Sequence, residues 1–502
     1  MLELLNLSLS LKADQRSLTE DFSFTLLPGD KAVIIGEEGN GKSTLLKYAN
    51  DPNSVISYCD TKGKVVKKGK CCYLAQLAPD ELLAAPVCEI FADAEVTECF
   101  DVLAPLGLDF SFFYSSRPLS TFSGGEKVKL RLARILCERP EILLLDEPTN
   151  DLDIETLEWM EEFIKNSGIP VLFVSHDEML IENSANVIIH LEQLTRKTKC
   201  RATVCRAPYA DYISHRRAAF DRQETVAAKQ REDYKKQMER WRHIYDRVNH
   251  EQRTISRQDP GGARLLKKKM HSVLSMGKRF EREKENFLDF PEEEEAILTK
   301  FDPNISLPKG KTVLDLNLPE LSVDGRVLAQ DVSLKVYGGE HIGITGVNGC
   351  GKSTLLKLIA SELLPREDIS AAYMPQDYGE VLDHSLSPVE YLAKKYSKDD
   401  ITRARTYLGS MKFTHKEMTG PISALSGGQR AKILFLDMVL KGSNVLILDE
   451  PTRNFSPLSG PVVRKALSDF GGTIISVCHD RTYLHTVCDR VLVLDENGLH
   501  SL

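Results

Sequence analysis

Short, almost continuously apolar segments recur along the chain, and each is followed by glycine, by acidic residues, or by a Ser-His-Asp or Cys-His-Asp sequence. They are Lys31–Ile35, Leu143–Leu145, Val171–Val174, His341–Thr345, Val445–Leu448 and Thr473–Val477. Strands that are buried on both faces have this pattern, and they alternate with helices in α/β domains. We therefore predict two α/β domains, over residues 1–205 and 310–502.

The middle of the chain has a different pattern. Residues 209–257 contain no proline or glycine, which predicts one helix about 70 Å long. Residues 259–262 should break it, and a second helix is expected from about Arg264 to Asn286. We predict that residues 206–309 form a linker built on an antiparallel helical hairpin, like a coiled coil, with apolar seams that pack together. These seams are Tyr234, Met238, Trp241, Tyr245 and Val248, and Leu266, Met270, Val273, Phe280 and Phe287.

The two α/β segments repeat the same motifs in the same order. The separation of the copies is 310 residues for the first motif, 300 for the second and 303 for the rest. The change from 310 to 300 predicts a loop insertion of about ten residues near Thr61–Lys70. The paired motifs begin at Gly36 and Gly346, Tyr73 and Tyr373, Ser123 and Ser426, Asp146 and Asp449, and Ser175 and Cys478.

The first repeated motif, G-x-x-x-x-G-K-[ST], follows a strand and precedes a helix, as a phosphate-binding loop must. Its glycines let backbone N–H groups curl around phosphate oxygens, and the helix adds its positive end. Lys42 and Lys352 would reach the β- and γ-phosphates, while Ser43 and Ser353 would bind Mg²⁺. The predicted nucleotide-binding residues are Gly36, Gly39, Asn40, Gly41, Lys42, Ser43 and Thr44, and Gly346, Gly349, Cys350, Gly351, Lys352, Ser353 and Thr354.

Two carboxylates end a buried strand in each copy. Asp146 and Asp449 would hold the metal ion, and the following glutamates, Glu147 and Glu450, would polarise the attacking water. His176 and His479 each follow another buried strand and would orient this water. The combination predicts hydrolysis of a nucleoside triphosphate.

Charge is distributed unevenly along the chain. The net charge is −8 overall, but residues 201–290 carry +9 and the remainder −17. Residues 241–280 hold ten Lys and Arg against three Asp and Glu, which favours a phosphate backbone as partner, with a solvated helical face as the alternative. The candidate RNA contacts are Arg253, Arg257, Arg264, Lys267, Lys268 and Lys269.

Several classes of protein are excluded. Apolar residues are 42% and charged residues 27% of the chain, which is typical of a globular protein. No apolar run approaches the ~20 residues of a membrane-spanning helix, and the N-terminal residues do not resemble a secretion signal. The eleven cysteines lack zinc-site spacing, so we expect reduced thiols and a cytoplasmic protein.

These motifs closely resemble the ATP-binding cassette superfamily, whose Ser-Gly-Gly signature recurs here as Ser123, Gly124 and Gly125 and as Ser426, Gly427 and Gly428. The resemblance implies two cassettes that face each other, with ATP held between them at two composite sites. In each site the signature amides of one cassette bind the γ-phosphate held by the other, and Gln76 or Gln376 joins the metal. Closure would require ATP and would relax after hydrolysis.

Two cassettes joined by a long charged hairpin resemble the F subfamily, whose members act on ribosomes as translation factors or as antibiotic-resistance (ribosomal protection) proteins. In that family the hairpin enters the exit-tRNA site and its tip approaches the peptidyl-tRNA and the peptidyl-transferase centre. The resemblance implies a monomer that binds the ribosome in its ATP-closed state and leaves after hydrolysis. Two alternatives remain: an ATP-binding subunit of a membrane exporter, and an RNA-binding scaffold that does not hydrolyse ATP.

The two copies differ at two places. The first phosphate loop carries Glu37 and Glu38 where the second has Val347 and Asn348, and residues 453–457 lack the Leu-Asp pair of residues 152–153. Both departures would fall on the composite site of Lys42, which we expect to bind or turn over nucleotide less well. Neither copy has an aromatic residue where adenine usually stacks, so the choice between ATP and GTP stays open.

The choice between a resistance role and a general translation role also stays open. The chain ends soon after the second cassette, and the interval from Gln76 to Ser123 is short for an arm insertion; both features favour resistance. The short turn at residues 259–262 leaves little room for an extended drug-site loop, and this feature favours the general translation role.

Overall fold

The computed structural model describes the chain except residues 95, 97, 98, 100–102, 150, 151, 195, 196, 255–259, 292–300, 324, 394–396 and 502. The chain forms two compact units. One combines residues 1–209 with residues 294–502 and holds both repeats, and the other is residues 210–293. Within the described residues, no helix has the length and apolar character needed to cross a membrane.

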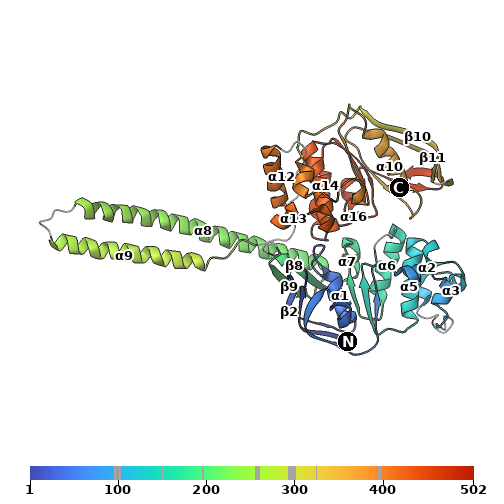
Figure 1. The fold of residues 1–502 in the computed structure, drawn as a ribbon, viewed down its shortest axis with the longest axis horizontal. Helices are drawn as coiled ribbons and strands as arrows, with labels where there is room; N and C mark the ends of the chain where they lie inside the picture. The colour runs from blue at the N-terminus through green and yellow to red at the C-terminus, as the bar shows by residue number, and fades with distance from the viewer. Residues whose placement is uncertain are drawn as a thin grey trace. The chain divides into compact units, whose positions relative to one another are not determined.

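The first cassette is built on a six-stranded sheet of order β5-β6-β7-β3-β8-β9, with helices packed against it (Figure 1). All neighbouring strands are parallel except β8 and β9. Its strands and α-helices are β1 Leu2–Leu11, β2 Ser17–Leu26, β3 Lys31–Ile35, α1 Lys42–Asn50, β4 Cys59–Lys67, β5 Cys71–Leu74, α2 Asp80–Ala84, α3 Val87–Ile90, α5 Gly124–Leu136, β6 Ile142–Asp146, α6 Ile154–Asn166, β7 Val171–Val174, α7 Glu178–Ser184, β8 Val187–Leu194 and β9 Lys199–Cys205.

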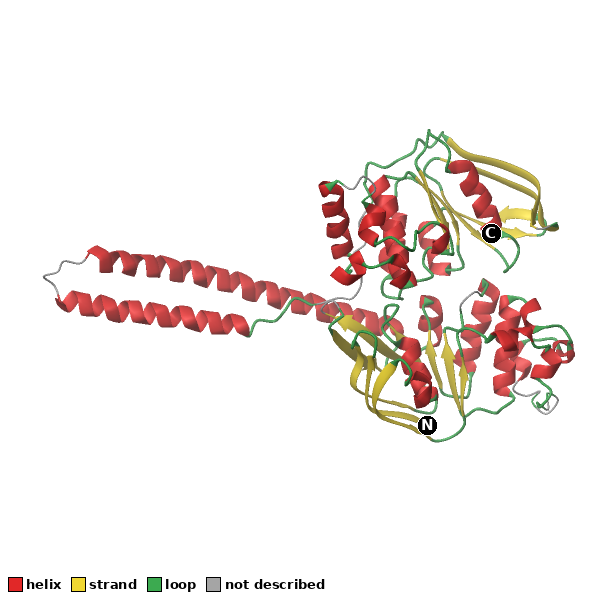
Figure 2. Ribbon diagram, in the orientation of Figure 1, coloured by secondary structure: helices red, strands yellow, loops and turns green. Residues whose placement is uncertain are grey.

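The second cassette repeats this topology in a sheet of order β13-β14-β15-β12-β16-β17 (Figure 2). Only the β16–β17 pair is antiparallel. Its strands and α-helices are β10 Thr312–Val323, β11 Arg326–Tyr337, β12 His341–Thr345, α10 Lys352–Leu363, β13 Ala371–Met374, α11 Pro388–Leu392, α12 Lys398–Ser410, α13 His415–Thr419, α14 Gly427–Lys441, β14 Val445–Asp449, α15 Gly460–Ser468, β15 Thr473–Val477, α16 Arg481–Val487, β16 Arg490–Asp495 and β17 Gly498–Ser501.

The central strands are buried along their whole length. Every residue of β3, β6 and β7 in the first sheet and of β12, β14 and β15 in the second is buried. Burial on both faces explains why their sequences are nearly continuous apolar runs rather than alternating ones. Because the strands are parallel, their carboxyl ends meet at one edge, where the repeated motifs come together.

The predicted loop insertion in the first cassette is wrong. The residues form strand β4, which pairs with β1 in the sheet β2-β1-β4, whereas among the described residues of the second cassette the corresponding sheet consists of β10 and β11. Gly63, at φ +103, lies beside a register shift in this pairing and lets the lysine-rich segment pass close to β1. The high lysine and glycine content had suggested a loop, but lysines suit an exposed edge strand.

The second unit contains two antiparallel helices, α8 Tyr209–Thr254 and α9 Pro260–Glu285 (Figure 1). All ten predicted seam residues are buried or half-buried. Trp241 donates its indole N–H to the carbonyl of Val273 at 2.8 Å, and a Cβ added at Gly277 would lie 3.0 Å from its ring, a tight contact. The aromatic residues of the seam therefore serve as its core.

The predicted start of the second helix is wrong by one turn. Helix α9 begins at Pro260 rather than Arg264, so Gly261 and Gly262 belong to its first turn. Proline is tolerated at this position because the first N–H groups of a helix have no partner within the helix.

Candidate nucleotide sites between the cassettes

The two phosphate loops have the same backbone conformation. Gly36 and Gly346 have φ values of +145 and +147, and Gly41 and Gly351 are left-handed immediately before α1 and α10. A Cβ at Gly36 would lie 2.2 Å from the carbonyl oxygen of Leu191, so only glycine fits there. The repeated conformation is the curled backbone that the sequence motif predicted.

The lysine of each loop is already folded over it. The ammonium group of Lys42 donates to the carbonyls of Gly36 and Glu37 at 2.9 and 3.1 Å. Lys352 makes the equivalent bonds at 2.8 and 2.9 Å. Neither α1 nor α10 has a side-chain cap, so the N–H groups that begin each helix can take an anion. Both loops therefore fit a polyphosphate.

The polar side chains of the two loops are not equivalent. The Asn40 amide donates to the carbonyl of Leu191 at 2.9 Å and is 1% exposed, so this side chain ties the loop to β8. Cys350, its counterpart, is buried, and burial raises the pKa of its thiol. The backbone N–H groups of Asn40 and Cys350 donate to the carbonyls of Glu37 and Val347 at 3.2 and 3.4 Å, so both residues also hold the curl of their loops.

The aspartates at the ends of β6 and β14 differ in their partners. Asp146 accepts hydrogen bonds from the Ser43 and Tyr73 hydroxyls, each at 2.8 Å. Asp449 is 2% exposed, yet neither carboxylate oxygen has a partner at hydrogen-bonding geometry. Burial raises the pKa of both carboxyls. A divalent cation would satisfy the orphaned oxygens of Asp449, so this donor set fits Mg²⁺.

The glutamates that follow these aspartates, Glu147 and Glu450, have left-handed backbones. Their φ values are +47 at Glu147 and +51 at Glu450, a conformation that costs about 1–3 kcal/mol for a residue with a side chain. Glu147 accepts a hydrogen bond from the Gln76 amide at 3.0 Å. Burial, and secondarily the charge of Asp449, raise the pKa of Glu450 to about 8. The same strained turn aims a carboxylate at each cavity.

The two histidines also differ. His176 Nε2 lies 3.4 Å from the Glu147 carboxylate, and its Nδ1 lies 2.9 Å from the carbonyl oxygen of Phe455 in the other cassette. Since a carbonyl only accepts, Nδ1 carries the proton. The Nδ1 of His479 is buried without a partner, and burial lowers the pKa of this histidine to about 4.

The signature segments begin helices α5 and α14. Ser123 and Ser426 cap these helices in reciprocal capping boxes with Glu126 and Gln429. Gly124 lines the cavity that contains Lys352, and the N–H of Gly428 donates to the Glu38 carboxylate. Each signature segment thus approaches the phosphate loop of the other cassette.

Two cavities are lined by many of the predicted residues, whereas others, among them Asp146 and the signature segment Ser426–Gly428, line neither cavity. One, of about 830 Å³, contains Lys352 and is also lined by Ser353, Thr354, Gln376, Asp449, Glu450 and His479. The other, of about 430 Å³, contains Lys42 and is also lined by Gly39, Gly41, Ser43, Thr44, Gln76, Glu147 and His176. Both volumes suit a small ligand.

Sequence reasoning missed four arginines at these cavities, one of which, Arg464, lines the Lys352 cavity and pairs with Glu178. Arg16 lines the Lys42 cavity beside Leu18, and Arg326 lines the Lys352 cavity beside Leu328. These pairs are related by the same 310-residue offset as the phosphate loops, which would have revealed them. Arg453 lines both cavities; it belongs to residues 453–459 of the second cassette, which we call the interface loop.

The two departures noted in the sequence lie in contact. The Glu37 carboxylate accepts hydrogen bonds from the Ser456 and Ser459 hydroxyls and lies 3.5 Å from the Lys432 ammonium group. Burial alone would raise the pKa of Glu37, but Lys432 and the two hydroxyls lower it to about 2. This carboxylate is held by the other cassette.

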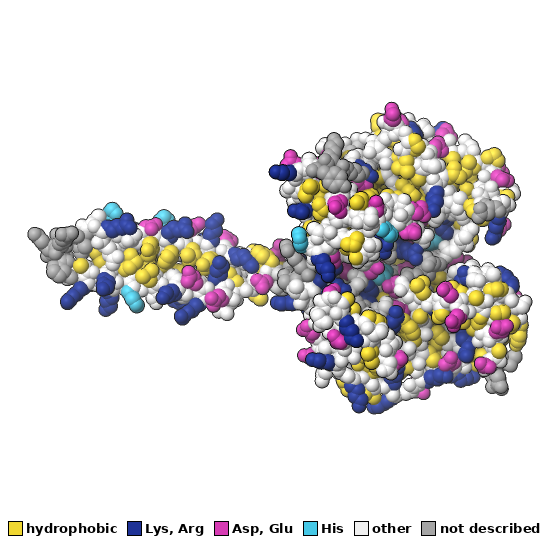
Figure 3. All heavy atoms as spheres, viewed as in Figure 1, with side chains coloured by type: hydrophobic (Ala, Val, Ile, Leu, Met, Phe, Trp, Pro, Cys, Tyr) yellow, Lys and Arg dark blue, Asp and Glu magenta, His cyan; other side chains and the backbone are white. Residues whose placement is uncertain are grey.

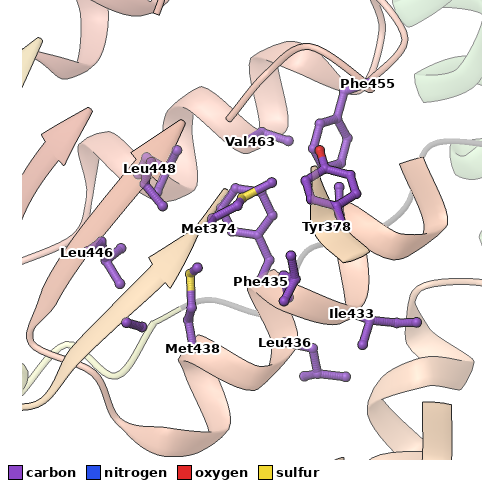
Figure 4. Packing of buried hydrophobic residues seen from close by; sticks show 14 of the residues in the cluster. Met374, Tyr378, Ile433, Phe435, Leu436, Met438, Leu446, Leu448, Phe455 and Val463 are labelled. Carbon is purple, nitrogen blue, oxygen red and sulfur yellow. The ribbon is translucent and has the colours of Figure 1, made fainter. Parts of the chain in front are cut away.

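The interface loop of the second cassette is anchored by Phe455. Its ring packs on Phe435 with centroids 5.9 Å apart and joins the buried cluster around Tyr378 (Figure 4). Asn454 adds a hydrogen bond to the Tyr378 hydroxyl at 2.8 Å. The loop that replaces the Leu-Asp pattern therefore has its own apolar anchor.

The candidate RNA contacts surround the far end of the hairpin. Lysines and arginines flank the apolar stripe between the helices (Figure 3). Arg257 lies outside the described residues. The other five are exposed, and we call them the tip cations: Arg253, Arg264, Lys267, Lys268 and Lys269.

Comparison with protein families decides the identity of the two cassettes. The model described as "ABC transporter" matches twice, at residues 19–150 and 329–453, about half of the chain in total. The chain belongs to this ATP-binding cassette family. It is accordingly an ATPase, and the predictions of the superfamily, of the two α/β cassettes and of ATP hydrolysis are confirmed.

Curated relatives of this cassette protein include members of the F subfamily. It is 24% identical to ABC transporter F family member 2 of Arabidopsis thaliana over 96% of this chain and 75% of that protein. It is 27% identical to the probable ATP-binding protein YheS of Escherichia coli over 97% of this chain and 78% of that protein. It is 30% identical to human ATP-binding cassette sub-family F member 3 over 83% of this chain, which spans 57% of that longer protein.

A solved structure shares the fold of this cassette protein. It is the archaeal ribosome recycling factor aABCE1 in complex with the ribosomal stalk protein aP1, with a TM-score of 0.59 and 17% identity over 99% of this chain and 90% of that chain.

Proposed function

We propose that the chain hydrolyses ATP with Mg²⁺ at two composite sites. Asp146 and Asp449, with Ser43, Ser353, Gln76 and Gln376, would hold the metal ion, which when bound neutralises phosphate charge. Glu147 and Glu450 would accept a proton from the attacking water. His176 and His479 would orient that water, and the signature amides of Ser123–Gly125 and Ser426–Gly428 would bind the terminal phosphate.

We propose boundaries of 1–205 and 310–502 for the cassettes and 206–309 for the linker, and we propose that this linker carries the protein to the ribosome. The exposed tip cations support this proposal most directly, since clustered cations attract RNA backbones without reading sequence. The F-subfamily relatives and a structural neighbour described as a ribosome recycling factor favour the same partner. The hairpin would reach the peptidyl-tRNA near the peptidyl-transferase centre.

We propose that ATP closes the cassettes of a cytoplasmic monomer on the ribosome and that hydrolysis releases it. Ion pairs between the cassettes, Arg464 with Glu178 and Arg481 with Glu161, are groups through which closure could act. All eleven thiols are free, which suits a reducing compartment. Antibiotic resistance by ribosomal protection and translation regulation are both consistent with this cycle.

We further propose that the two sites are unequal and that the Lys42 site binds or turns over ATP less well. The smaller cavity and the acidic residues of its loop support this difference. Glu147→Gln and Glu450→Gln should therefore reduce ATPase activity unequally, with the larger loss from Glu450→Gln. Equal losses would contradict the inequality.

Cosedimentation with ribosomes tests the proposal. The double variant Glu147→Gln/Glu450→Gln should pellet with ribosomes when ATP is present and stay in the supernatant without it. A variant with all five tip cations changed to Gln should stay in the supernatant in both conditions. Failure of the double variant to pellet would refute ribosome binding. Copurification of membrane proteins would then favour the exporter alternative, while nucleotide-independent pelleting without turnover would favour the scaffold.

A further inference from the structure

The acidic pair in the first phosphate loop contacts two elements of the other cassette, helix α14 and the interface loop. Glu37 binds the interface loop and Lys432, whereas Glu38 accepts a hydrogen bond from the backbone N–H of Gly428. The second phosphate loop has Val347 and Asn348 at these positions. The acidic pair thus brings a carboxylate of the phosphate loop itself onto the opposite signature segment at the Lys42 site, whereas at the other site the carboxylate bound to Ser123 is that of Glu126 in the same helix.

The N–H of Gly428 belongs to the first turn of α14, a 15-residue helix. In this turn the Ser426 side chain accepts from the N–H of Gln429, so the cap leaves the Gly428 N–H for another acceptor. The positive end of a helix favours an anion. Glu38 supplies that anion from the protein, at the group that would otherwise bind a terminal phosphate.

Glu37 fixes the backbone from which Glu38 extends. Its partners Ser456 and Ser459 follow Phe455, whose ring is anchored in the core of the second cassette. Ser456 occupies the position of Asp153 in the first cassette, by the 303-residue offset. An aspartate there would repel Glu37, whereas the serine hydroxyl donates to it. The acidic loop and the changed interface loop are therefore complementary.

The volumes of the two cavities also differ, and the smaller cavity is the one at the Lys42 site. The cavity lined by Glu38 has about half the volume of the cavity lined by Asn348, about 430 against 830 Å³. A nucleoside triphosphate in the smaller cavity would have to displace the Glu38 carboxylate from Gly428 and bring its own negative charge beside it. A nucleoside diphosphate would leave that hydrogen bond in place.

We propose that the Lys42 site selects a nucleoside diphosphate, because the Glu38 carboxylate replaces the terminal phosphate on the signature segment of the second cassette. This inference rests on the proposed pair of composite sites and restricts the proposed hydrolysis of ATP to one of them. The Lys352 site would then carry the ATP-dependent step, while the Lys42 site stays closed around a diphosphate.

Nucleotide binding to one site at a time tests this selectivity. In full-length Lys352→Ala protein, fluorescent ADP should bind the Lys42 site at least about tenfold more tightly than a non-hydrolysable ATP analogue, the factor expected for one hydrogen bond to a charged group. Glu38→Asn, which copies the second loop, should remove this preference. Glu38→Gln keeps the side-chain length and should lower the preference less than Glu38→Asn but measurably.

The reverse substitution provides the matched control. In Lys42→Ala protein, Asn348→Glu should weaken binding of the ATP analogue to the Lys352 site about tenfold and leave ADP binding unchanged. Two results would overturn the inference. One is an unchanged preference for ADP after Glu38→Asn, and the other is a preference of the Lys352→Ala protein for the ATP analogue. Circular dichroism spectra would verify folding of each variant. These binding assays contain no ribosomes, so their outcome is independent of the cosedimentation result.

Discussion

Replacing Glu37 by Gln should destabilise the cassette unit in a pH-dependent way. The substitution removes the charge that pairs with Lys432, whose side chain is only 9% exposed, and weakens two serine hydrogen bonds. Lowering a carboxyl pKa from 4.5 to about 2 corresponds to about 3 kcal/mol of stability. Breaking a buried ion pair has a similar cost, about 3–5 kcal/mol.

The sign of the pH dependence follows from the lowered pKa. The folded protein holds the Glu37 proton less tightly than the unfolded chain does, so the stabilisation is complete above about pH 4.5 and is lost as the pH falls toward 2. Urea denaturation followed by circular dichroism should give a difference between parent and variant of about 3 kcal/mol at pH 7 and less than half of that at pH 3. The exposed Glu81→Gln serves as control. A difference that is the same at both pH values, or no larger than that of the control, would refute the assigned contacts.

Three further predictions follow from other contacts. Trp241→Ala should lower the free energy of unfolding of the hairpin by about 2–3 kcal/mol, because it removes the hydrogen bond to Val273 and leaves a cavity in the seam. Thermal melts of the full chain would measure this loss, and an unchanged transition would contradict the packing. Changing Lys267–Lys269 to Gln should weaken the affinity of the protein for ribosomes. The slope of log affinity against log salt concentration should become shallower by up to about two, whereas a steeper slope would exclude phosphate contacts. We expect the guanidinium group of Arg326, which lines the Lys352 cavity beside Leu328, to pack on the base of the nucleotide. Arg326→Ala should therefore raise the KM for ATP severalfold with little change in kcat, and a change in kcat alone would contradict that role.

The repeated elements could be predicted from the sequence because each has a local cause. Strands such as Lys31–Ile35 and His341–Thr345 lie where continuous apolar runs predicted them, since burial on both faces leaves that pattern. The seam of the hairpin was likewise set by the spacing of Trp241 and its neighbours. The order of the motifs also predicted which residues lie at the carboxyl ends of the strands, and the cavities lie at these ends.

Features that depend on distant partners could not be predicted. Strand β4 forms because β1 offers an edge, not because its own lysine-rich sequence favours a strand. The family resemblance placed Glu37 and residues 453–457 at one composite site, but nothing near Glu37 in the sequence indicates that the hydroxyls of Ser456 and Ser459, more than 400 positions away, donate to its carboxylate. The left-handed backbone at Glu147 and Glu450 is likewise imposed by the surrounding fold and not by the residue type.

Site-specific crosslinking tests most directly whether the nucleotide-bound cassettes deliver the hairpin to ribosomal RNA. A photoreactive amino acid at Lys268, at the exposed end of α9, would be compared with one at Glu81 on the first cassette. In the Glu147→Gln/Glu450→Gln protein with ATP, the account predicts RNA crosslinks from position 268, none from position 81, and loss of the crosslinks when ATP is omitted. Absence of RNA crosslinks from position 268 with ATP, or equal crosslinking without it, would contradict the account.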